Sequence, residues 1–228
     1  MDIKYLIDKW GKEFQNELWD ELPYSEYANL SSMILYAVIR ENKFKNIFEM
    51  GCERQSRSSY IIQKALLKND DDFTHYMSDF PIILEQAIEN LFNKVGVSAV
   101  AGDVTEVNFD YKDIDFLFID AHHEKWFASW YLDSIIPQLK KGTYIHVHDI
   151  YLYQDWQHRF PEVICETQEF QERNKQGNLS LDKLFWMEDL AMHDKDIWDY
   201  IQKKFNFIGN FPAPSLPYGD GTTYWIKK

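Results

Sequence analysis

Two short apolar runs, Phe116–Ile119 and Tyr144–Val147, constrain the fold of this chain more than any other part of its sequence. A short apolar run, or one rich in aromatic and β-branched residues, predicts a β-strand that is covered on both faces of its sheet. Between the two runs, apolar residues recur at three- and four-residue steps from Glu124 to Leu139, which predicts a helix lying on the sheet. A strand, a helix and a second strand form one right-handed βαβ unit with parallel strands.

Side chains that bind protons or metals follow both predicted strands. Asp120, His122 and His123 come after the first strand. His148 and Asp149 come directly after the second strand. Because the carboxyl ends of parallel strands meet at one edge, we expect all of these side chains at the edge where open α/β sheets bind ligands. A single such residue often has only a structural role, as a helix cap or a packed histidine, but a group from neighbouring strands favours a functional site.

The remaining pattern extends this unit into a larger sheet. Further strands are predicted at Asn46–Met50, Thr74–Met77 and Val97–Ala101, and helices are predicted between them at Tyr60–Leu67 and Ile82–Phe92. Strands that alternate with helices along the chain are typical of a parallel sheet with helices on both faces. The predicted fold class is therefore α/β, with a doubly wound, mostly parallel sheet of seven strands.

The two ends of the chain add elements to this core. N-terminal helices are predicted in residues 1–22 and Glu26–Glu41, and the first is expected to dock on the domain or to make a homodimer contact. One or two helices are predicted in Leu181–Phe205. The last two strands, Phe205–Phe211 and Thr222–Lys227, flank a loop rich in proline and glycine, which suits an antiparallel hairpin.

Composition limits the number of domains and the choice of partners. With 228 residues, of which 45% are hydrophobic, the chain is long enough for one domain with a sizeable core. The formal net charge of -13 argues against binding to nucleic acid or to an anionic membrane. We expect a single domain over residues 1–228, made of N-terminal helices, a cofactor-binding core, an acceptor-side insertion and a C-terminal segment, in residues 1–41, 42–150, 151–180 and 181–228.

Two further observations concern the cellular compartment. The cysteines, Cys52 and Cys165, are far apart, so neither a disulfide framework nor a cysteine-rich zinc site is expected. The N-terminus lacks a basic and then apolar leader, and no apolar run approaches the roughly 20 residues that span a bilayer. We therefore expect a cytoplasmic protein that does not bind membranes.

A glycine turn follows the first predicted strand and precedes a helix. Glycine lets a ligand approach the backbone, and the helix N-terminus offers free N–H groups, as in nucleotide-binding units. Gly51 is the single glycine of this turn, so the turn by itself does not define a nucleotide site. Asp79 follows the second strand, where a carboxylate can accept both hydroxyls of a ribose. The alternative is that Asp79 caps the helix that begins near Pro81.

The order of the predicted elements resembles the class I S-adenosylmethionine-dependent methyltransferases, over nearly the whole chain. Their Rossmann-like sheet ends in the same kind of hairpin. Four segments look like a bacterial branch of this family that is linked to the modification of sugars or small metabolites, and they are Phe118–His123, Gly142–Ile150, Phe185–Glu188 and Gly221–Lys227. The resemblance implies S-adenosylmethionine as cofactor and a small molecule as acceptor.

The same resemblance implies roles for individual residues. Glu49 and Gly51 would form the cofactor turn, and Asp79 would contact the ribose. Asp103 would lie near the adenine. Asp120 would lie at the border between methyl donor and acceptor.

The glycine turn departs from the family pattern at one place. The family usually has a second glycine two residues after the first, and here Glu53 holds that position. A charged side chain there would block or reshape the methionine pocket. The alternative function is therefore a methyltransferase-like binding or scaffold protein without turnover. A nicotinamide-dependent reductase agrees less well with the sequence, because that class has more glycine in its first turn.

The predicted activity is transfer of a methyl group to an oxygen of a small polar acceptor, such as a sugar or a related metabolite. The protein has to align the displacement and remove the hydroxyl proton. His123 is the first candidate for this base and His148 the second, because an imidazole with a pKa near 6.5 is mostly neutral at pH 7. Helical steps from His123 to Trp126 and Phe127 place it on the sheet side. His122 is expected to cover the loop instead.

A divalent metal ion is a further possibility at this edge of the sheet. Asp120 and Asp149 are expected to lie close together, because their strands are predicted neighbours. Two carboxylates can hold a cation that polarises the acceptor oxygen. The nearby imidazoles favour a softer metal than Mg²⁺, and a reaction without metal stays open.

Overall fold

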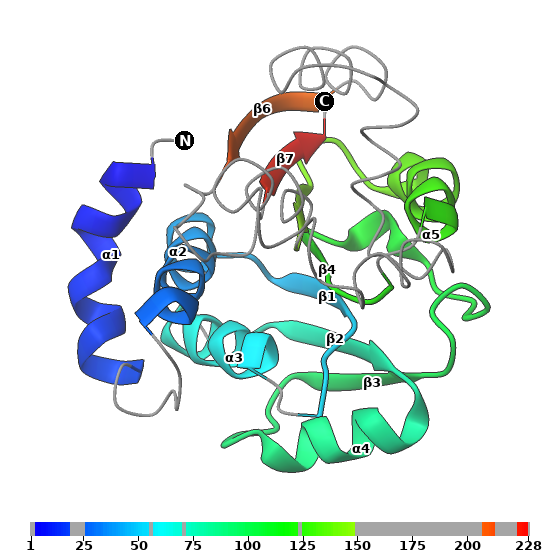
Figure 1. Ribbon diagram of the computed structural model, residues 1–228, viewed down its shortest axis with the longest axis horizontal. Helices are drawn as coiled ribbons and strands as arrows, with labels where there is room; N and C mark the ends of the chain where they lie inside the picture. The colour runs from blue at the N-terminus through cyan, green and yellow to red at the C-terminus, as the bar shows by residue number, and fades with distance from the viewer. Residues whose placement is uncertain are drawn as a thin grey trace, which may run out of the picture.

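One mixed sheet forms the centre of the protein in the computed structural model (Figure 1). The structure describes residues 3–18, 26–54, 57–69, 72–122, 125–148, 207–212 and 223–227. Within these ranges the sheet has seven strands, which are β1 (Asn46–Met50), β2 (Thr74–Asp79), β3 (Val97–Ala101), β4 (Phe116–Ile119), β5 (Tyr144–Val147), β6 (Phe207–Pro212) and β7 (Thr223–Lys227). Their order across the sheet is β3-β2-β1-β4-β5-β7-β6.

The pairing of the strands confirms the predicted topology. β1 to β5 pair in parallel, whereas β7 runs antiparallel to both β5 and β6. The doubly wound sheet with a C-terminal hairpin is therefore confirmed. Because β1 pairs with β2 on one side and with β4 on the other, the direction of winding reverses between β1 and β4. Open α/β sheets bind their ligands at such a reversal.

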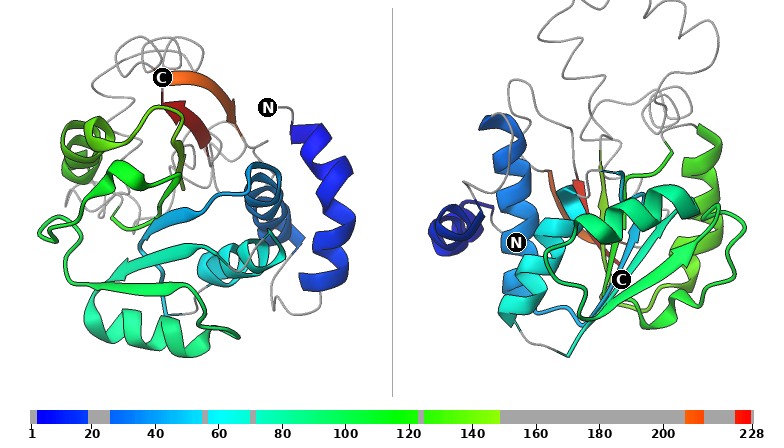
Figure 2. Two further views of the ribbon diagram at one scale, coloured as in Figure 1. Left: turned by 180° about the vertical axis from the view of Figure 1, so that it is seen from behind. Right: turned by 90° about the horizontal axis from the view of Figure 1, so that it is seen from below.

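Helices cover both faces of this sheet (Figure 2). They are α1 (Ile3–Leu18), α2 (Glu26–Asn42), α3 (Arg57–Asn69), α4 (Pro81–Asn90) and α5 (Lys125–Trp130). One apolar cluster joins α1, α2 and α3 to the sheet, and a second cluster on the other face contains the α5 residue Phe127. Among the described residues, no helix is both long and apolar enough to cross a bilayer. The helices predicted in Leu181–Phe205 and the insertion at 151–180 lie outside the described residues.

The N-terminal helix docks on its own chain. Leu6, Phe14 and Leu18 of α1 are fully buried and share a cluster with Ile34 and Val38 of α2. Burial of an apolar side chain of this size contributes about 1.5–3 kcal/mol. The prediction that this helix docks on its own domain is thus confirmed. The alternative, a homodimer contact, stays a prediction.

The helix predicted over Glu124–Leu139 is wrong in its second half. α5 ends at Trp130, and the chain continues as a π-helical turn over Tyr131–Ile135 and a 3₁₀ turn over Ile136–Gln138. Pro137 supplies the physical reason, because its ring has no N–H to donate and clashes with the preceding helical turn. The spacing of the apolar residues still predicts burial correctly, because Tyr131, Leu132 and Ile135 are buried.

A buried histidine is expected to make the stability of this fold depend on pH. His146 lies in β5 with 1% exposure, and its ring stacks on Phe118 at 4.6 Å between ring centroids. Burial lowers the pKa of His146 well below 6.5, and His148 adds to this effect. Below pH 6.5 the unfolded chain therefore binds more protons than the folded state. The free energy of unfolding should fall as the pH drops, by at most about 1.4 kcal/mol per pH unit.

Urea unfolding between about pH 5 and about pH 7 measures this dependence. His146→Phe keeps the stacked ring but binds no proton, so its free energy of unfolding should change less with pH. Equal slopes for the two proteins would contradict the assignment to His146.

Candidate functional site

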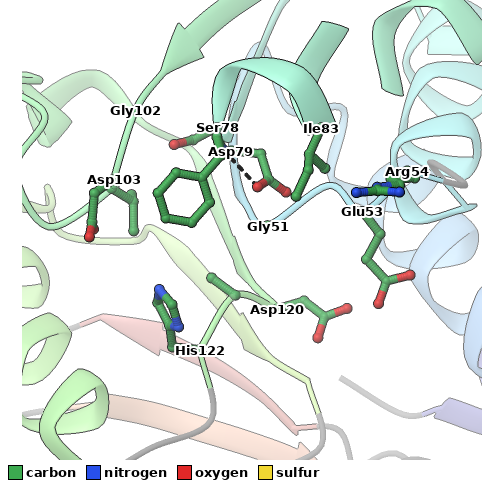
Figure 3. A pocket seen from close by; sticks show the side chains of 13 residues that line it. Gly51, Glu53, Arg54, Ser78, Asp79, Ile83, Gly102, Asp103, Asp120 and His122 are labelled. Carbon is green, nitrogen blue, oxygen red and sulfur yellow. Dashed lines mark hydrogen bonds between the residues drawn. The ribbon is translucent and has the colours of Figure 1, made fainter. Parts of the chain in front are cut away.

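A cavity of about 460 Å³ opens at the carboxyl ends of β1, β2, β3 and β4 (Figure 3). It lies where the winding of the sheet reverses. Its walls are formed by Gly51, Glu53, Arg54, Ser78, Asp79, Phe80, Ile83, Gly102, Asp103, Val104, Asp120, Ala121 and His122. Every residue predicted for the cofactor site except Glu49 therefore lines this cavity.

Gly51 is required by a close approach of two backbone segments. Its φ angle is +81°, and its N–H donates to the carbonyl of Ser78 at 2.9 Å. A Cβ atom at this position would lie 2.2 Å from the carbonyl oxygen of Asp120 and 2.7 Å from the Cα of Ala121. Glycine thus allows the turn after β1 to contact the chain that leaves β4.

Asp79 joins the end of β2 to the glycine turn. Its Oδ2 accepts a hydrogen bond from the N–H of Cys52 at 3.2 Å, and its Oδ1 accepts one from the N–H of Phe80 at 2.7 Å. α4 begins at Pro81 and has no side-chain cap, so the alternative of a helix cap is wrong. The thiol of Cys52 makes a third, longer contact with Oδ2 at 3.8 Å. A carboxylate has about four acceptor sites, so Asp79 keeps capacity for a ligand, chiefly at Oδ1.

Asp103 carries a carboxylate that stays ionised. Its Oδ1 accepts hydrogen bonds from the backbone N–H and the hydroxyl of Thr105, at 2.9 and 2.7 Å. These two bonds, and to a smaller extent the charge on His122, lower the pKa of Asp103. The site therefore presents a negative charge at the end of β3 at neutral pH.

His122 lies in the cavity wall. Its ring packs against Trp126 and Phe127, at 5.3 and 5.4 Å between ring centroids. The expectation that His122 covers the loop is wrong, because α5 begins at Lys125 and its helical phase does not extend back to this residue. The neighbouring His123 lies outside the described residues, so its position stays a prediction.

Glu49 is buried behind the turn and does not line the cavity. Its Oε1 accepts from the hydroxyl of Ser58 at 2.5 Å, and its Oε2 accepts from the hydroxyl of Ser59 at 2.7 Å. The imidazole of His75 lies 2.9 Å from Oε2, and Gln63 contacts the other ring nitrogen at 3.2 Å. This network joins β1, β2 and α3 beneath the turn. The predicted contact between Glu49 and the cofactor stays a prediction.

Cys52 does not provide a reactive thiolate. Its side chain is fully buried. Burial raises the pKa of the thiol, and the nearby carboxylates of Glu49 and Asp79 raise it further. A protonated thiol is a poor nucleophile, so covalent catalysis by this residue is not expected.

Asp120 and His148 follow neighbouring strands. The N–H of Asp120 donates to the carbonyl of Met50 at 2.8 Å, and that of His148 donates to the carbonyl of Ile119 at 2.9 Å. The two residues come directly after the last paired positions of β4 and β5. Parallel strands lie about 4.8 Å apart, so Asp120 and His148 are neighbours at this edge.

The structure leaves the predicted metal pair untested. Asp149 lies outside the described residues. Within the described ranges, histidine, cysteine and carboxylate side chains form no group of three or more that could hold a metal ion. The pairing of Asp120 with Asp149 therefore stays a prediction.

Glu53 has an unusual backbone conformation for its residue type. Its φ angle is +49°, in the left-handed region that favours glycine. Lys43 also has a positive φ, but it directly follows helix α2, where this conformation is common. The strain at Glu53 costs about 1–2 kcal/mol. Glu53 stands where the methyltransferases that this chain resembles usually have their second glycine. Its backbone therefore has the conformation that glycine would adopt there.

Three cavity residues with ionisable side chains were not among the predicted site residues. They are Glu53, Arg54 and His122. Their place in the glycine turn and after β4 was a usable signal, because each follows a strand end on the ligand side of the sheet. The structure adds that their side chains reach the cavity (Figure 3).

Comparison with known proteins identifies the class of this protein. Residues 30–150 match a protein family described as a methyltransferase domain, and they make up more than half of the chain. The chain therefore belongs to this methyltransferase family. A comparison with curated proteins finds no match.

Solved structures of methyltransferases have a similar fold over nearly the whole chain. The methyltransferase PaMTH1 from Podospora anserina is 14% identical, with a TM-score of 0.59 over 100% of this chain and 88% of that one. A candidate caffeoyl-CoA O-methyltransferase from Staphylococcus aureus is 20% identical, with a TM-score of 0.58 over 99% of both chains. An O-methyltransferase from Bacillus cereus is 14% identical, with a TM-score of 0.55 over 98% of this chain and 96% of that one. The predicted methyltransferase class and fold are thus confirmed.

Proposed function

We propose that this protein transfers the methyl group of S-adenosylmethionine to an oxygen atom of a small polar acceptor, such as a sugar or a related metabolite. The order of the cavity side chains carries this proposal. Along the sheet edge they are Asp103 after β3, Asp79 at the end of β2, the Gly51 turn after β1, and Asp120 after β4. The cofactor has the matching order of adenine, ribose and methionine, and the acceptor would lie beside Asp120.

The functional groups suit these parts of the cofactor. The ionised carboxylate of Asp103 can accept a hydrogen bond from the exocyclic amine of adenine. Asp79 has acceptor capacity left at Oδ1 for a ribose hydroxyl, and a second hydroxyl can replace the weak contact of the Cys52 thiol with Oδ2. Gly51 has no side chain, so the methionine part can approach the backbone of the turn.

The size and charge of the cavity support the same assignment. A volume of about 460 Å³ lies within the range of roughly 300–1,000 Å³ that small-molecule sites occupy. Asp79, Asp103 and Asp120 make its lining acidic. S-adenosylmethionine, when bound, supplies a methyl group on a positively charged sulfonium, which an acidic lining attracts.

The comparisons support the cofactor and the type of acceptor atom. The structures of PaMTH1 and of the Bacillus cereus O-methyltransferase hold S-adenosylhomocysteine, the demethylated form of the cofactor. Neighbours described as O-methyltransferases favour an oxygen acceptor. A sugar or similar metabolite is proposed from the four segments that resemble the bacterial branch, such as Phe118–His123.

Removal of the acceptor proton is assigned to a histidine. His123 is the proposed base, because it follows Asp120 closely in the chain at the acceptor end of the cavity. His148 is the second candidate, since it lies beside Asp120 at the edge of the sheet. No step of this proposal requires the metal pair of Asp120 and Asp149.

Thermal unfolding in the presence of S-adenosylhomocysteine tests the proposal. A ligand at a hundred times its Kd stabilises the folded state by roughly 2.7 kcal/mol, which gives a clear rise in melting temperature. A protein without turnover would show the same rise but no methyl transfer from labelled cofactor to any small polar acceptor. Absence of any rise with either form of the cofactor would contradict the proposed function.

Asp79→Ala should weaken the binding of S-adenosylhomocysteine tenfold or more, or about 1.4 kcal/mol. The variant loses the carboxylate that would accept the ribose hydroxyls and also frees the N–H of Cys52. Isothermal titration calorimetry measures the effect. Asp133→Ala removes an exposed carboxylate that does not line the cavity, and it should bind like the original protein. Equal affinities for both variants would remove Asp79 from the cofactor site.

A further inference from the structure

Two adjacent residues of opposite charge line one end of the cavity. Glu53 and Arg54 are both exposed and both form part of its wall. Figure 3 shows them on one side of the cavity, with Asp103 and His122 on the other side and Asp79 between. Toward the described part of the chain, neither side chain makes a hydrogen bond or an ion pair. Both charged residues are thus exposed in the cavity wall, where a ligand can contact them.

The backbone of Glu53 is held in a conformation that costs free energy. Its φ angle of +49° is unfavourable for a residue with a side chain. Glu53 lies within the turn that follows β1, whereas Lys43 directly follows the end of a helix. Strained residues of this kind cluster at ligand sites, where the surrounding structure holds them in place.

The other carboxylate of this segment is committed elsewhere. Both oxygens of Glu49 accept hydrogen bonds from serine hydroxyls of α3, and His75 contacts one of them. Glu49 is fully buried. Of the described acidic residues in the turn after β1, Glu53 is the one that can reach a ligand in the cavity.

We propose that Glu53 and Arg54 bind the two charged groups at the amino-acid end of the cofactor. The carboxylate of Glu53 would accept hydrogen bonds from the α-ammonium group, and the guanidinium of Arg54 would donate to the α-carboxylate. This assignment rests on the proposed function. Glu53, at the position of the family's second glycine, then recognises the methionine part of the cofactor and does not block the methionine pocket.

The assignment makes the pair selective for one part of the ligand. Adenine and ribose would contact Asp103 and Asp79, at the far side and in the middle of the cavity. A ligand that has the adenosine part but no amino-acid end would not contact Glu53 or Arg54. 5′-Deoxy-5′-methylthioadenosine is such a ligand, and S-adenosylhomocysteine has both parts.

Calorimetric titration of both ligands into Glu53→Gln and Arg54→Met tests the assignment. Each variant removes one charge and keeps a side chain of similar length. We expect a loss of about tenfold in affinity for S-adenosylhomocysteine, because hydrogen bonds between charged groups are the strong ones. The affinity for methylthioadenosine should change less than about twofold. Glu89→Gln and Lys94→Met make the same charge changes at exposed positions outside the cavity and should leave both affinities unchanged.

The possible outcomes separate this inference from the proposed function. Failure of the original protein to bind either ligand would overturn both. A second outcome is that the original protein binds both ligands and the two variants bind S-adenosylhomocysteine with the same affinity as the original protein. In that case only the role of Glu53 and Arg54 is overturned. A parallel loss for both ligands would show a general disturbance of the turn and would also overturn the pair's role. Glu53→Gly, which relieves the backbone strain, should be more stable than the original protein and yet bind S-adenosylhomocysteine more weakly.

Discussion

Replacing His123 by alanine is expected to lower the turnover of methyl transfer by about 10²–10⁴-fold, while the affinity for S-adenosylhomocysteine is unchanged. A general base acts on the acceptor hydroxyl and not on the cofactor, so its loss should affect kcat alone. His123 comes three residues after Asp120, which lines the cavity at the end of β4. Steady-state kinetics with an identified acceptor, together with calorimetric titration, separate the two quantities.

Two other histidines serve as controls for this prediction. His122→Ala should reduce turnover little but should weaken cofactor binding, because His122 lines the cavity near Asp103. His148→Ala should show a smaller loss of turnover than His123→Ala. If His148→Ala shows the larger loss, the base is His148, which lies beside Asp120 at the sheet edge. Small and equal losses at all three positions would assign the deprotonation to solvent.

The fold was predictable because its strands differ strongly from their surroundings. Phe116–Ile119 is a short apolar run between two aspartates, Asp115 and Asp120. Val97–Ala101 is rich in small and β-branched residues and lies between two glycines. Parallel pairing followed from the alternation of strands and helices, which leaves few other topologies. The position of Asp79 and Asp120 at one edge then needed no further information, because the ends of parallel strands coincide there.

Side-chain partners were harder to predict than positions along the chain. Glu49 lies in β1, two residues before Gly51, and its carboxylate contacts Ser58, Ser59 and His75 from two other elements. Those contacts depend on the register of β1 with β2 and on the rotation of α3. A pattern along one strand contains neither quantity, so the burial of Glu49 could not be derived from it.

Local backbone conformation was the second limit. The sequence places Glu53 where the resembling family has glycine, but the residue type alone suggests an ordinary φ angle. The tertiary structure holds it at +49° instead. Likewise, the apolar steps after Trp126 continue through the π-helical turn, so they did not reveal where α5 ends. In both cases packing overrides local preference.

Replacing Gly51 by alanine is expected to destabilise the fold by about 2–4 kcal/mol. The added Cβ would lie 2.2 Å from the carbonyl oxygen of Asp120, whereas carbon and oxygen atoms in contact are normally about 3.3 Å apart. Both partners are backbone atoms, so no side chain can rotate to relieve the clash. The end of β4 would have to move, and with it the cavity wall at Asp120 and Ala121. Binding of S-adenosylhomocysteine should therefore be lost together with stability.

Gly142→Ala is the matched control for this substitution. Gly142 has a similar φ angle of +87°, but a Cβ there would meet no atom within 4 Å. It should therefore cost only the backbone strain, roughly 1 kcal/mol after the smaller entropy of the unfolded chain is counted. Urea unfolding gives the free energies of both variants. Similar losses for Gly51→Ala and Gly142→Ala would mean that conformational strain, and not the contact with the chain after β4, requires glycine in the turn.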